Sequence, residues 1–371
     1  MIILAIETSC DDTGIAIVDV NNETINILSN IVNTQTVHSN YGGVFPMVAK
    51  QEHIKNIDSA YDESYKNAGE PKIDAIALTV GPGLEPSLWV GIKFAEELSQ
   101  KLNVPIIPVN HMEGHLLSSL LPVYEFNKDI KFREIPEKAI SLLVSGGHTQ
   151  IIDMNGLGNY KIIGTTLDDA VGEAYDKVAR MLDLPYPGGP AISKLAQKAR
   201  TSPQPSPWQA EGAMNALDST NSDLKPITFP RFPRPMLHSK DYNFSYSGLK
   251  TAVLYYIRDL IKEREDKNLS EVEKMLIARE FEDAAIEVII KKTLRAIEET
   301  NSTHLLLGGG VAANKHLQNE LDRISKENNF TVYYPVKEIT GDNALMIAIA
   351  GYFNKDKQTF KNQKANGSLK I

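Results

Sequence analysis

Two histidines with helical spacing form the pattern in this sequence that is most typical of metal chemistry. His111 and His115 stand four residues apart, and in a helix this spacing places both imidazoles on one face, within reach of one metal ion. A bare H-x-x-x-H spacing is more often a pair of satisfied or solvated histidines. A third ligand would favour the metal site.

Asp342 is the candidate third ligand. It lies in Thr340-Gly-Asp-Asn343, a turn that precedes the apolar segment 344–350. An aspartate at this place can equally cap the helix that the apolar segment predicts. The spacing alone leaves both interpretations open.

The position of Glu113 disfavours a peptidase. In the zinc-peptidase motif H-E-x-x-H the glutamate base directly follows the first histidine. Here Glu113 follows His111 by two residues, which at 3.6 residues per turn is about 200° around the helix. The carboxylate is therefore expected to point away from a metal held by the two histidines, and a metallopeptidase is an alternative that lacks its base.

Three glycine-rich turns predict a binding site for a nucleotide-sized ligand. They lie at residues 145–148, 187–190 and 308–314, each at a predicted strand end or in a connecting turn. Glycine lets the backbone approach a phosphate, and exposed N–H groups at a helix start attract anions. Any one turn can need glycine for its conformation alone, but three in one chain favour a ligand. None matches the G-x-x-x-x-G-K-[ST] motif, which excludes a P-loop ATPase.

Residues 165–180 predict a helix with acidic side chains on one side, among them Asp169, Glu173 and Asp176. One interpretation is a solvated face. The other is that a carboxylate of this helix binds ribose hydroxyls, as acidic residues do in other nucleotide sites.

The elements that must position these groups form two related α/β halves with a cleft between them. Residues 2–6 and 14–18 predict a β-hairpin, and residues 73–110 predict strand, glycine turn, helix and strand. The same order begins again at Ala139. Helical periodicity over 247–258 and 270–299 predicts long, packed helices.

The chain is expected to divide into a first lobe at 1–135, a second lobe at 136–345, and a helix end with a basic tail at 346–371. A segment at about 202–227 is rich in Pro, Ser, Asn and Gln and predicts a surface insert without a catalytic role. The lysine-rich end, KDKQTFKNQKANGSLKI, has little apolar content and is expected to be frayed.

Composition restricts the class of protein. Of 371 residues, 39 are Lys or Arg and 47 are Asp or Glu, which gives a formal net charge of −8. This balance disfavours nucleic-acid binding over a broad surface and leaves room only for a local basic face. A single cysteine, Cys10, excludes an internal disulfide. No window approaches the roughly 20 apolar residues of a membrane-spanning helix, and the start lacks a secretory signal, so we expect a cytoplasmic protein that does not act at a membrane.

A series of motifs occurs in order between Ile3 and about Gly351: IETSCDDTGIAI, NHMEGHLLS, LLVSGGHTQ, DDAVGEAYDKVARML, YPGGP, FPRPMLHS, FSYSGLKTAV, GGGVAANKHL and TGDNALMIA. Together they resemble the universal tRNA N(6)-adenosine threonylcarbamoyltransferase family, formerly labelled O-sialoglycoprotein endopeptidase. The resemblance implies an actin-like ATPase fold of two duplicated α/β lobes, which agrees with the two halves predicted above.

The resemblance also implies site residues. One divalent metal ion per subunit, usually Fe²⁺ and replaceable by Zn²⁺ or Mg²⁺ in vitro, is expected at the positions that match His111, His115 and Asp342. Substrate contacts are expected at the positions that match Leu143, Val144, Ser145, Gly146, Gly147, Asp176, Gly189 and Asn314. Two positions depart from the family pattern. Ser193 is aspartate in some relatives, and Ser9-Cys-Asp-Asp12 stands where the family has SCDE.

The implied reaction moves a threonylcarbamoyl group from threonylcarbamoyl-AMP to the exocyclic amine of adenosine 37, in tRNAs that read codons beginning with A, and releases AMP. The donor is already activated, so orientation and charge stabilisation matter more than a protein nucleophile. Asp11 or Asp12 is the candidate acceptor for the proton of the amine.

The resemblance also implies partners, because the family works in a complex with an inactive paralogue of the same fold and a small P-loop ATPase. Besides a peptidase, a sugar- or acetate-kinase-like nucleotide-binding protein of the same fold is an alternative, but it would not need the histidine pair.

Overall fold

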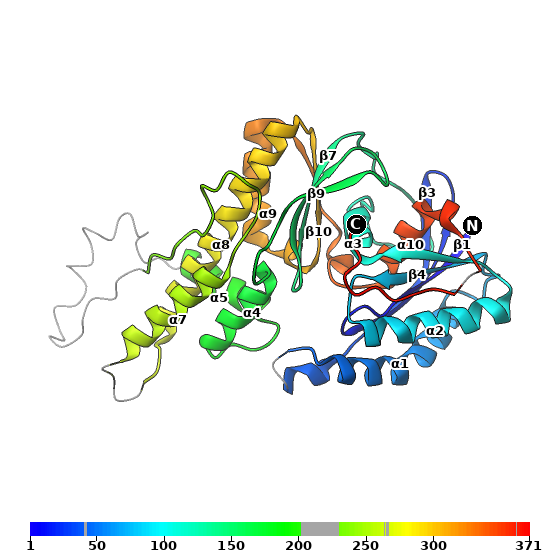
Figure 1. Cartoon of the computed structure of the whole chain (residues 1–371), viewed down its shortest axis with the longest axis horizontal. Coiled ribbons are helices and arrows are strands. Elements are labelled where there is room, and N and C mark those ends of the chain that lie inside the picture. The colour runs from blue at the N-terminus through cyan, green and yellow to red at the C-terminus, as the bar shows by residue number, and fades with distance from the viewer. Residues whose placement is uncertain (41–42, 202–229, 263, 265–266, 361) are drawn as a thin grey trace.

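The computed structural model describes residues 1–40, 43–201, 230–262, 264, 267–360 and 362–371, so the predicted insert at 202–227 lies outside it. Two β-sheets, each covered by helices, form two lobes that lie side by side (Figure 1). No helix in these ranges is both long and apolar enough to cross a membrane.

The first sheet has the strand order β5-β4-β1-β2-β3-β6. β1, β2 and β3 form an antiparallel meander, whereas β4 and β5 run parallel to β1. β6 pairs with the outer edge of β3. The strands are β1 Ile2–Glu7, β2 Asp12–Val20, β3 Thr24–Thr34, β4 Ala75–Gly81, β5 Ile106–Asn110 and β6 Asp129–Lys131.

The second sheet repeats this plan in the order β11-β10-β7-β8-β9. β7, β8 and β9 are an antiparallel meander, and β10 and β11 run parallel to β7. Its strands are β7 Ala139–Val144, β8 Thr149–Met154, β9 Tyr160–Thr165, β10 His304–Gly308 and β11 Thr331–Tyr333. The same order and directions in both sheets confirm the prediction of two duplicated α/β lobes.

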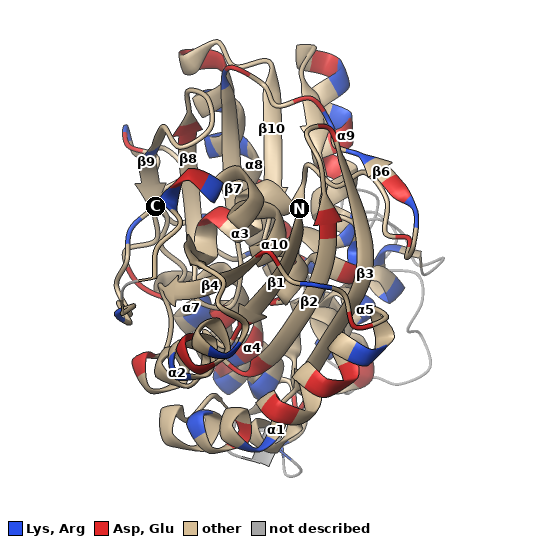
Figure 2. Cartoon of the chain, turned by 90° about the vertical axis from the view of Figure 1, so that its right-hand side faces the viewer, with Lys and Arg blue, Asp and Glu red and all other residues tan. Residues whose placement is uncertain are grey.

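Helices cover both faces of the first sheet, which explains why its strands β1 and β4 are apolar almost throughout. Leu4 and Ile6 of β1 point to the face covered by α1 and α2, whereas Ile3 and Ala5 point to the face covered by α3 and α10. The helices of this lobe are α1 Pro46–Asn67, α2 Glu85–Leu102, α3 His111–Ser118 and α10 Ala344–Phe353. Seen from this lobe, charges of both signs are interspersed on α1 (Figure 2).

The helices α3 and α10 lie between the two sheets. Their core contains Leu116 and Ile349 together with Leu143, Ile152 and Leu306 from the second sheet. α10 is buried along nearly its whole length, because the first sheet packs on one side and α3 on another. The two lobes therefore share one apolar core around the helix that carries the histidine pair.

A group of helices covers the outer face of the second sheet. α8 crosses this face and packs against α5, α7 and α9, as the periodicity of the sequence predicts for 247–258 and 270–299. The helices are α4 Val171–Met181, α5 Gly188–Thr201, α7 Ser247–Ile261, α8 Glu271–Thr300 and α9 Lys315–Asn328. Short 3-10 helices lie at η1 Thr36–Asn40, η2 Gly310–Ala313, η3 Lys337–Ile339 and η4 Lys355–Lys357.

The expectation of a frayed C-terminal tail is wrong. Thr359 exchanges both backbone hydrogen bonds with Ile106 at 2.9 Å, and the Asn366 N–H donates to the Val80 carbonyl at 2.9 Å. β5 is an edge strand with unpaired backbone groups, and the tail satisfies part of that edge. Backbone pairing of this kind needs no apolar side chains, which is why composition did not reveal it.

Candidate active site

The start of α3 holds the histidine pair. The side chain of Asn110 caps the helix, because its Oδ1 accepts hydrogen bonds from the N–H groups of Met112 at 2.8 Å and Glu113 at 3.3 Å. His111 and His115 follow within the first turns, with ring centroids 4.7 Å apart. β5 ends at the cap, so the sheet fixes where both imidazoles lie.

Asp342 faces these imidazoles and does not cap a helix. The cap of α10 is its neighbour Asn343, whose Oδ1 accepts from the Met346 N–H at 3.0 Å. Asp342 Oδ1 lies 3.0 Å from His115 Nε2 and 3.4 Å from His111 Nε2. The structure thus brings together the three residues that the sequence offers as metal ligands, with one possible ligand atom from each lying within 4.8 Å of the others.

Glu7 is a buried carboxylate that sequence reasoning missed. It contacts Nδ1 of His111, whereas Asp342 lies on the Nε2 side of the ring. Glu7 Oε2 lies 3.1 Å from His111 Nδ1 and also accepts a hydrogen bond from Thr79 Oγ1 at 2.6 Å. Burial alone would raise the pKa of Glu7, but the neighbouring His111 holds it below its usual value. The signal in the sequence is an ionisable residue directly at the end of an otherwise apolar strand.

The donor set fits a divalent transition metal. Two imidazole nitrogens and one carboxylate on one side of an ion leave further positions open, a pattern typical of Fe²⁺ sites. A carboxylate behind a ligating imidazole, here Glu7 behind His111, is the usual partner that fixes the ring. His115 Nδ1 is buried and has no hydrogen-bond partner among the described residues.

Glu113 does not join this group. Its Oε2 accepts a hydrogen bond from Asn354 Nδ2 at 2.9 Å, at the end of α10, and burial raises its pKa. The base that a zinc peptidase needs is therefore directed elsewhere.

The turn between β1 and β2 adds two carboxyl groups near Asp342. Burial raises the pKa of Asp11, and the charge of Asp342 raises it further. The pKa of Asp12 is raised by burial to about 7. Burial also raises the pKa of the Cys10 thiol well above its usual value, which disfavours the nucleophilic thiolate.

The glycine turn after β7 approaches the histidine pair from the second lobe. Leu143 and Val144 are fully buried, so they support the turn from the core. Gly146 and Gly147 are exposed, with open space where a Cβ would lie. At the end of the turn, burial together with nearby His111 and His115 lowers the pKa of His148 to about 4.

The turn after β10 lies against this first glycine turn. Gly309 has φ +88°, and a Cβ there would lie 2.4 Å from the Val144 carbonyl oxygen, so both conformation and space require glycine. The structure therefore places two of the three glycine-rich turns side by side.

The remaining predicted substrate contacts lie in the second lobe: Gly189 and Asn314 at the starts of α5 and α9, and Asp176 within α4. Asp176 Oδ1 accepts from the Gly188 N–H at 2.7 Å and so holds the start of α5, beside Gly189. Asn314 caps α9, and its Nδ2 donates to the fully buried Glu282 at 2.7 Å. Among the described residues, no hydrogen bond joins Asp176, Gly189 or Asn314 to the metal triad. Tyr186 lies near Asp11 and Asp176. Burial, followed by the charges of these two carboxylates, raises the pKa of Tyr186 to about 12.

Comparison with known proteins identifies the family. The family model described as tRNA N6-adenosine threonylcarbamoyltransferase (TsaD) matches residues 26–349. The chain belongs to this family. Three curated proteins of that name illustrate the similarity. The protein of Polynucleobacter asymbioticus is 42% identical, covering 95% of this chain and 91% of its own. The protein of Thermosipho africanus is 39% identical over 100% of both chains, and that of Clostridioides difficile is 38% identical over 95% and 93%.

Two solved structures share the fold of this threonylcarbamoyltransferase family member. HypF from T. kodakarensis superposes with a TM-score of 0.54 at 13% identity, covering 98% of this chain and 48% of that chain. Full-length HypF in a phosphate- and nucleotide-bound form gives a TM-score of 0.51 at 16% identity, covering 96% and 46%. The chain thus spans about half of HypF, and the likeness concerns the actin-like fold alone.

Membership in the threonylcarbamoyltransferase family makes this chain a tRNA-modifying transferase. The peptidase and kinase alternatives are not favoured by any of these relatives. tRNA is accordingly its substrate.

Proposed function

We propose that this chain transfers the threonylcarbamoyl group of threonylcarbamoyl-AMP to the exocyclic amine of adenosine 37, in tRNAs that read codons beginning with A. A bond forms between N6 and the carbamoyl carbon, the bond from that carbon to the phosphate oxygen breaks, and AMP leaves. Family membership supports the reaction class. The convergence of His111, His115 and Asp342 beside a glycine turn is the observation that carries the assignment of the site.

The metal that the family implies is proposed to be Fe²⁺, with Zn²⁺ or Mg²⁺ able to replace it in vitro. His111, His115 and Asp342 would hold it, and Glu7 would fix the first imidazole. When bound, such an ion supplies a Lewis acid for an oxygen of the carbamoyl or phosphate group. The residues themselves contribute a preformed, largely buried set of ligands.

The second lobe is proposed to hold the adenylate. The exposed backbone of Gly146 and Gly147, which follow the half-buried Ser145, gives a phosphate close access to N–H groups. Ser145 is proposed to complete this contact. Leu143 and Val144 support that turn from the core. Gly189 and Asn314, at the starts of α5 and α9, and Asp176 of α4, which holds the start of α5, are proposed to contact the ribose and base.

Asp11 is proposed to accept the proton that leaves the attacking amine. Its raised pKa brings a carboxylate closer to the value that suits a base at neutral pH, and Asp342 lies close enough to act on it. The protonated state of the Cys10 thiol supports a direct transfer without a covalent enzyme intermediate. Replacement Asp11→Asn should lower kcat while AMP binding is retained.

Partner proteins are proposed because the chain is acidic. With a net charge of −8 it has little general attraction for tRNA, and an inactive paralogue of the same fold with a small P-loop ATPase would complete the binding surface. We propose that this complex works in the cytoplasm.

The test is mass spectrometry of tRNA nucleosides after incubation with metal-loaded full-length chain, its partners, threonine, bicarbonate, ATP and the adenylate-forming enzyme. We expect threonylcarbamoyladenosine with the wild type and none with His115→Ala. The matched control is Glu113→Gln, a buried change on the same helix that leaves the triad intact. A His115→Ala protein with full transfer activity and full metal content would refute the assignment of the site.

A further inference from the structure

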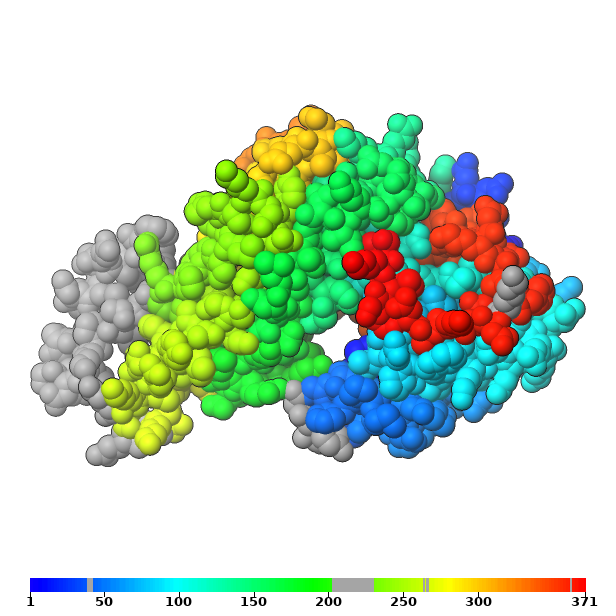
Figure 3. Space-filling model, in the orientation of Figure 1, coloured from blue at the N-terminus to red at the C-terminus, as the bar shows by residue number. Residues whose placement is uncertain are grey.

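A cavity of about 570 Å³ lies where the two lobes and the C-terminal tail meet. It is lined by Pro82, Met112, His148, Gln150, Ile162, Thr165 and residues 367–371. None of the residues to which we assign the adenylate is among them. In the space-filling view the tail lies at the boundary between the two lobes (Figure 3).

The cavity adjoins the metal triad. Met112 directly follows His111 on α3, and His148 lies close enough to His111 and His115 for their charges to act on it. His148 also ends the glycine turn of the proposed adenylate site. A ligand in this cavity would thus lie next to both the metal and the donor.

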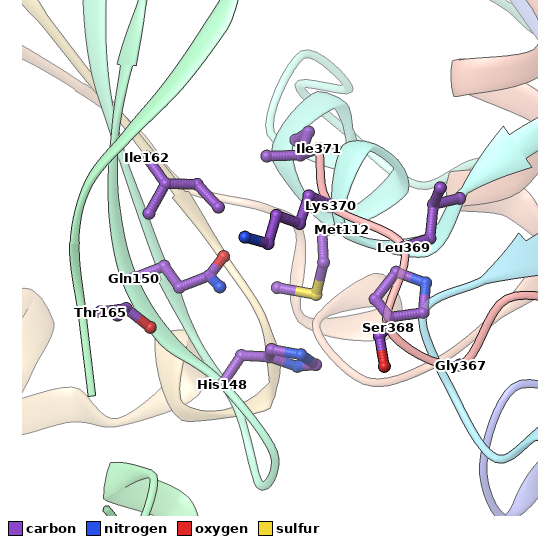
Figure 4. Close-up of a pocket in the computed structure, with 11 residues that line it drawn as sticks. Met112, His148, Gln150, Ile162, Thr165, Gly367, Ser368, Leu369, Lys370 and Ile371 are labelled. Carbon is purple, nitrogen blue, oxygen red and sulfur yellow. The ribbon is translucent and has the colours of Figure 1, made fainter. Parts of the chain in front are cut away.

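Gln150 contributes an unsatisfied hydrogen-bond acceptor to the cavity. Its Oε1 is buried and has no partner among the described residues, while its side chain points from β8 into the cavity (Figure 4). A buried acceptor without a partner is unfavourable, so such an atom indicates a group that arrives with a ligand. Met112 and Ile162 offer apolar surface on either side.

Lys370 adds a positive charge to the same cavity. The tail is anchored here because Asn110 Nδ2 donates to the Lys370 carbonyl at 3.1 Å. The Lys370 ammonium group reaches into the cavity toward Gln150 (Figure 4) and forms no ion pair within the described part of the chain. An exposed ammonium is suited to a phosphate of a polynucleotide.

We propose that this cavity binds the acceptor adenine of the tRNA, with its exocyclic amine donating to Gln150 Oε1 and a flanking phosphate contacting Lys370. The inference rests on the proposed function and assigns its second substrate a site. The cavity volume lies in the range of small-ligand sites and accommodates a nucleobase. Bases of single-stranded loops can be splayed out and inserted in this way. One N–H held by Gln150 fixes the orientation of the amine and leaves its second N–H free to lose a proton during the transfer.

The test compares two anticodon stem-loop RNAs, one with adenosine and one with purine riboside at the acceptor position. Purine riboside lacks the exocyclic amine. Binding is measured by fluorescence anisotropy with the metal-loaded full chain in complex with its proposed partners. We expect the wild type to prefer the adenosine RNA by about fivefold, the contribution of one hydrogen bond, and Gln150→Leu to bind both RNAs equally. Gln150→Glu, which keeps an acceptor, should retain the preference.

Lys370→Ala should weaken the binding of both RNAs to the same extent. Lys364 is an exposed lysine of the same tail outside the cavity, and Lys364→Ala should leave the binding of both RNAs unchanged. A wild type without preference, or a Gln150→Leu protein that keeps it, would overturn the proposal. If Gln150→Leu fails to fold, Gln150→Ala is judged by the same criterion. Failure of the proposed function is a separate outcome, in which the wild type with its partners forms no threonylcarbamoyladenosine at all.

Discussion

Glu7 contacts His111 and is not among the three residues that could hold the predicted metal, so we expect it to act on the metal through that imidazole. Its carboxylate is fully buried and is held by Thr79 and by the Ser9 N–H. Replacement Glu7→Gln removes the charge that stabilises the imidazole, and a loss of metal affinity of about 10–100-fold is expected. Competition with a chelator measures it.

Glu113→Gln is the control for this prediction, because Glu113 is buried on the same helix but bonds to Asn354. Equal metal affinity of Glu7→Gln and wild type would show that Glu7 does not support the ligand.

The sequence predicted the three candidate metal ligands, which the structure brings together, but it did not predict the carboxylate that supports them. His111 and His115 are four residues apart, so a prediction that this segment is helical is sufficient to predict that their side chains lie close together. The sequence left two interpretations of Asp342, a third metal ligand or a helix cap. In the structure the cap of α10 is Asn343, and Asp342 faces the histidine pair. Glu7 lies beside His111 because β1 pairs with β4, which in turn pairs with β5, and no local sequence pattern predicts that strand order.

The position of Asp342 depends on how closely α10 packs against β4. Gly351 allows this approach, since a Cβ there would lie 2.5 Å from the Cβ of Ala77. Gly351→Ala should therefore lower the free energy of unfolding by about 1–3 kcal/mol, although alanine is the better helix former. Chemical denaturation measures it.

Two variants control this prediction. Gly248→Ala in α7, where the nearest atom is a Pro235 carbon at 3.8 Å, should leave stability unchanged or raise it. Adding Ala77→Gly to Gly351→Ala should restore part of the loss. If the double variant is no more stable than Gly351→Ala, the close contact is not the cause.

The start of α8 carries a pH-dependent contribution to stability. Hydrogen bonds from Arg264 and Ser270 lower the pKa of Glu273 from 4.5 to about 2. Because the folded-state pKa lies below the unfolded one, this stabilisation is complete above pH 4.5 and is lost as the pH falls toward 2. Glu273→Gln should cost about 1 kcal/mol at pH 7.

Urea denaturation at pH 7 and pH 3.5 tests this, with the exposed Glu271→Gln in the same turn as control. The difference in free energy of unfolding between wild type and Glu273→Gln should be smaller at pH 3.5 than at pH 7. An equal difference at both pH values would show that the ionisation of Glu273 is not its cause.

At the scale of the whole molecule, the apolar pattern predicted the duplication because each lobe repeats its strands and turns along the chain. It did not predict the tail along β5, since backbone pairing at a sheet edge leaves no trace in hydrophobicity. An apolar segment such as α10 is predicted to be buried, but its sequence does not predict which elements pack against it. The structure places this helix between the first sheet and α3, although the 225 residues 119–343 lie between the two helices in the sequence.

This long separation gives the metal a role in the stability of the whole chain. An ion bound by His111, His115 and Asp342 links α3 to the segment before α10, and no such site exists in the unfolded chain. At a free metal concentration of about 100 times its dissociation constant, binding should add about 2.7 kcal/mol to the free energy of unfolding. Calorimetry of metal-loaded and chelator-treated protein should show a melting temperature several degrees higher with metal. Asp342→Asn should abolish that difference and Glu113→Gln should keep it, whereas an undiminished metal-dependent shift in Asp342→Asn would place the bound ion elsewhere.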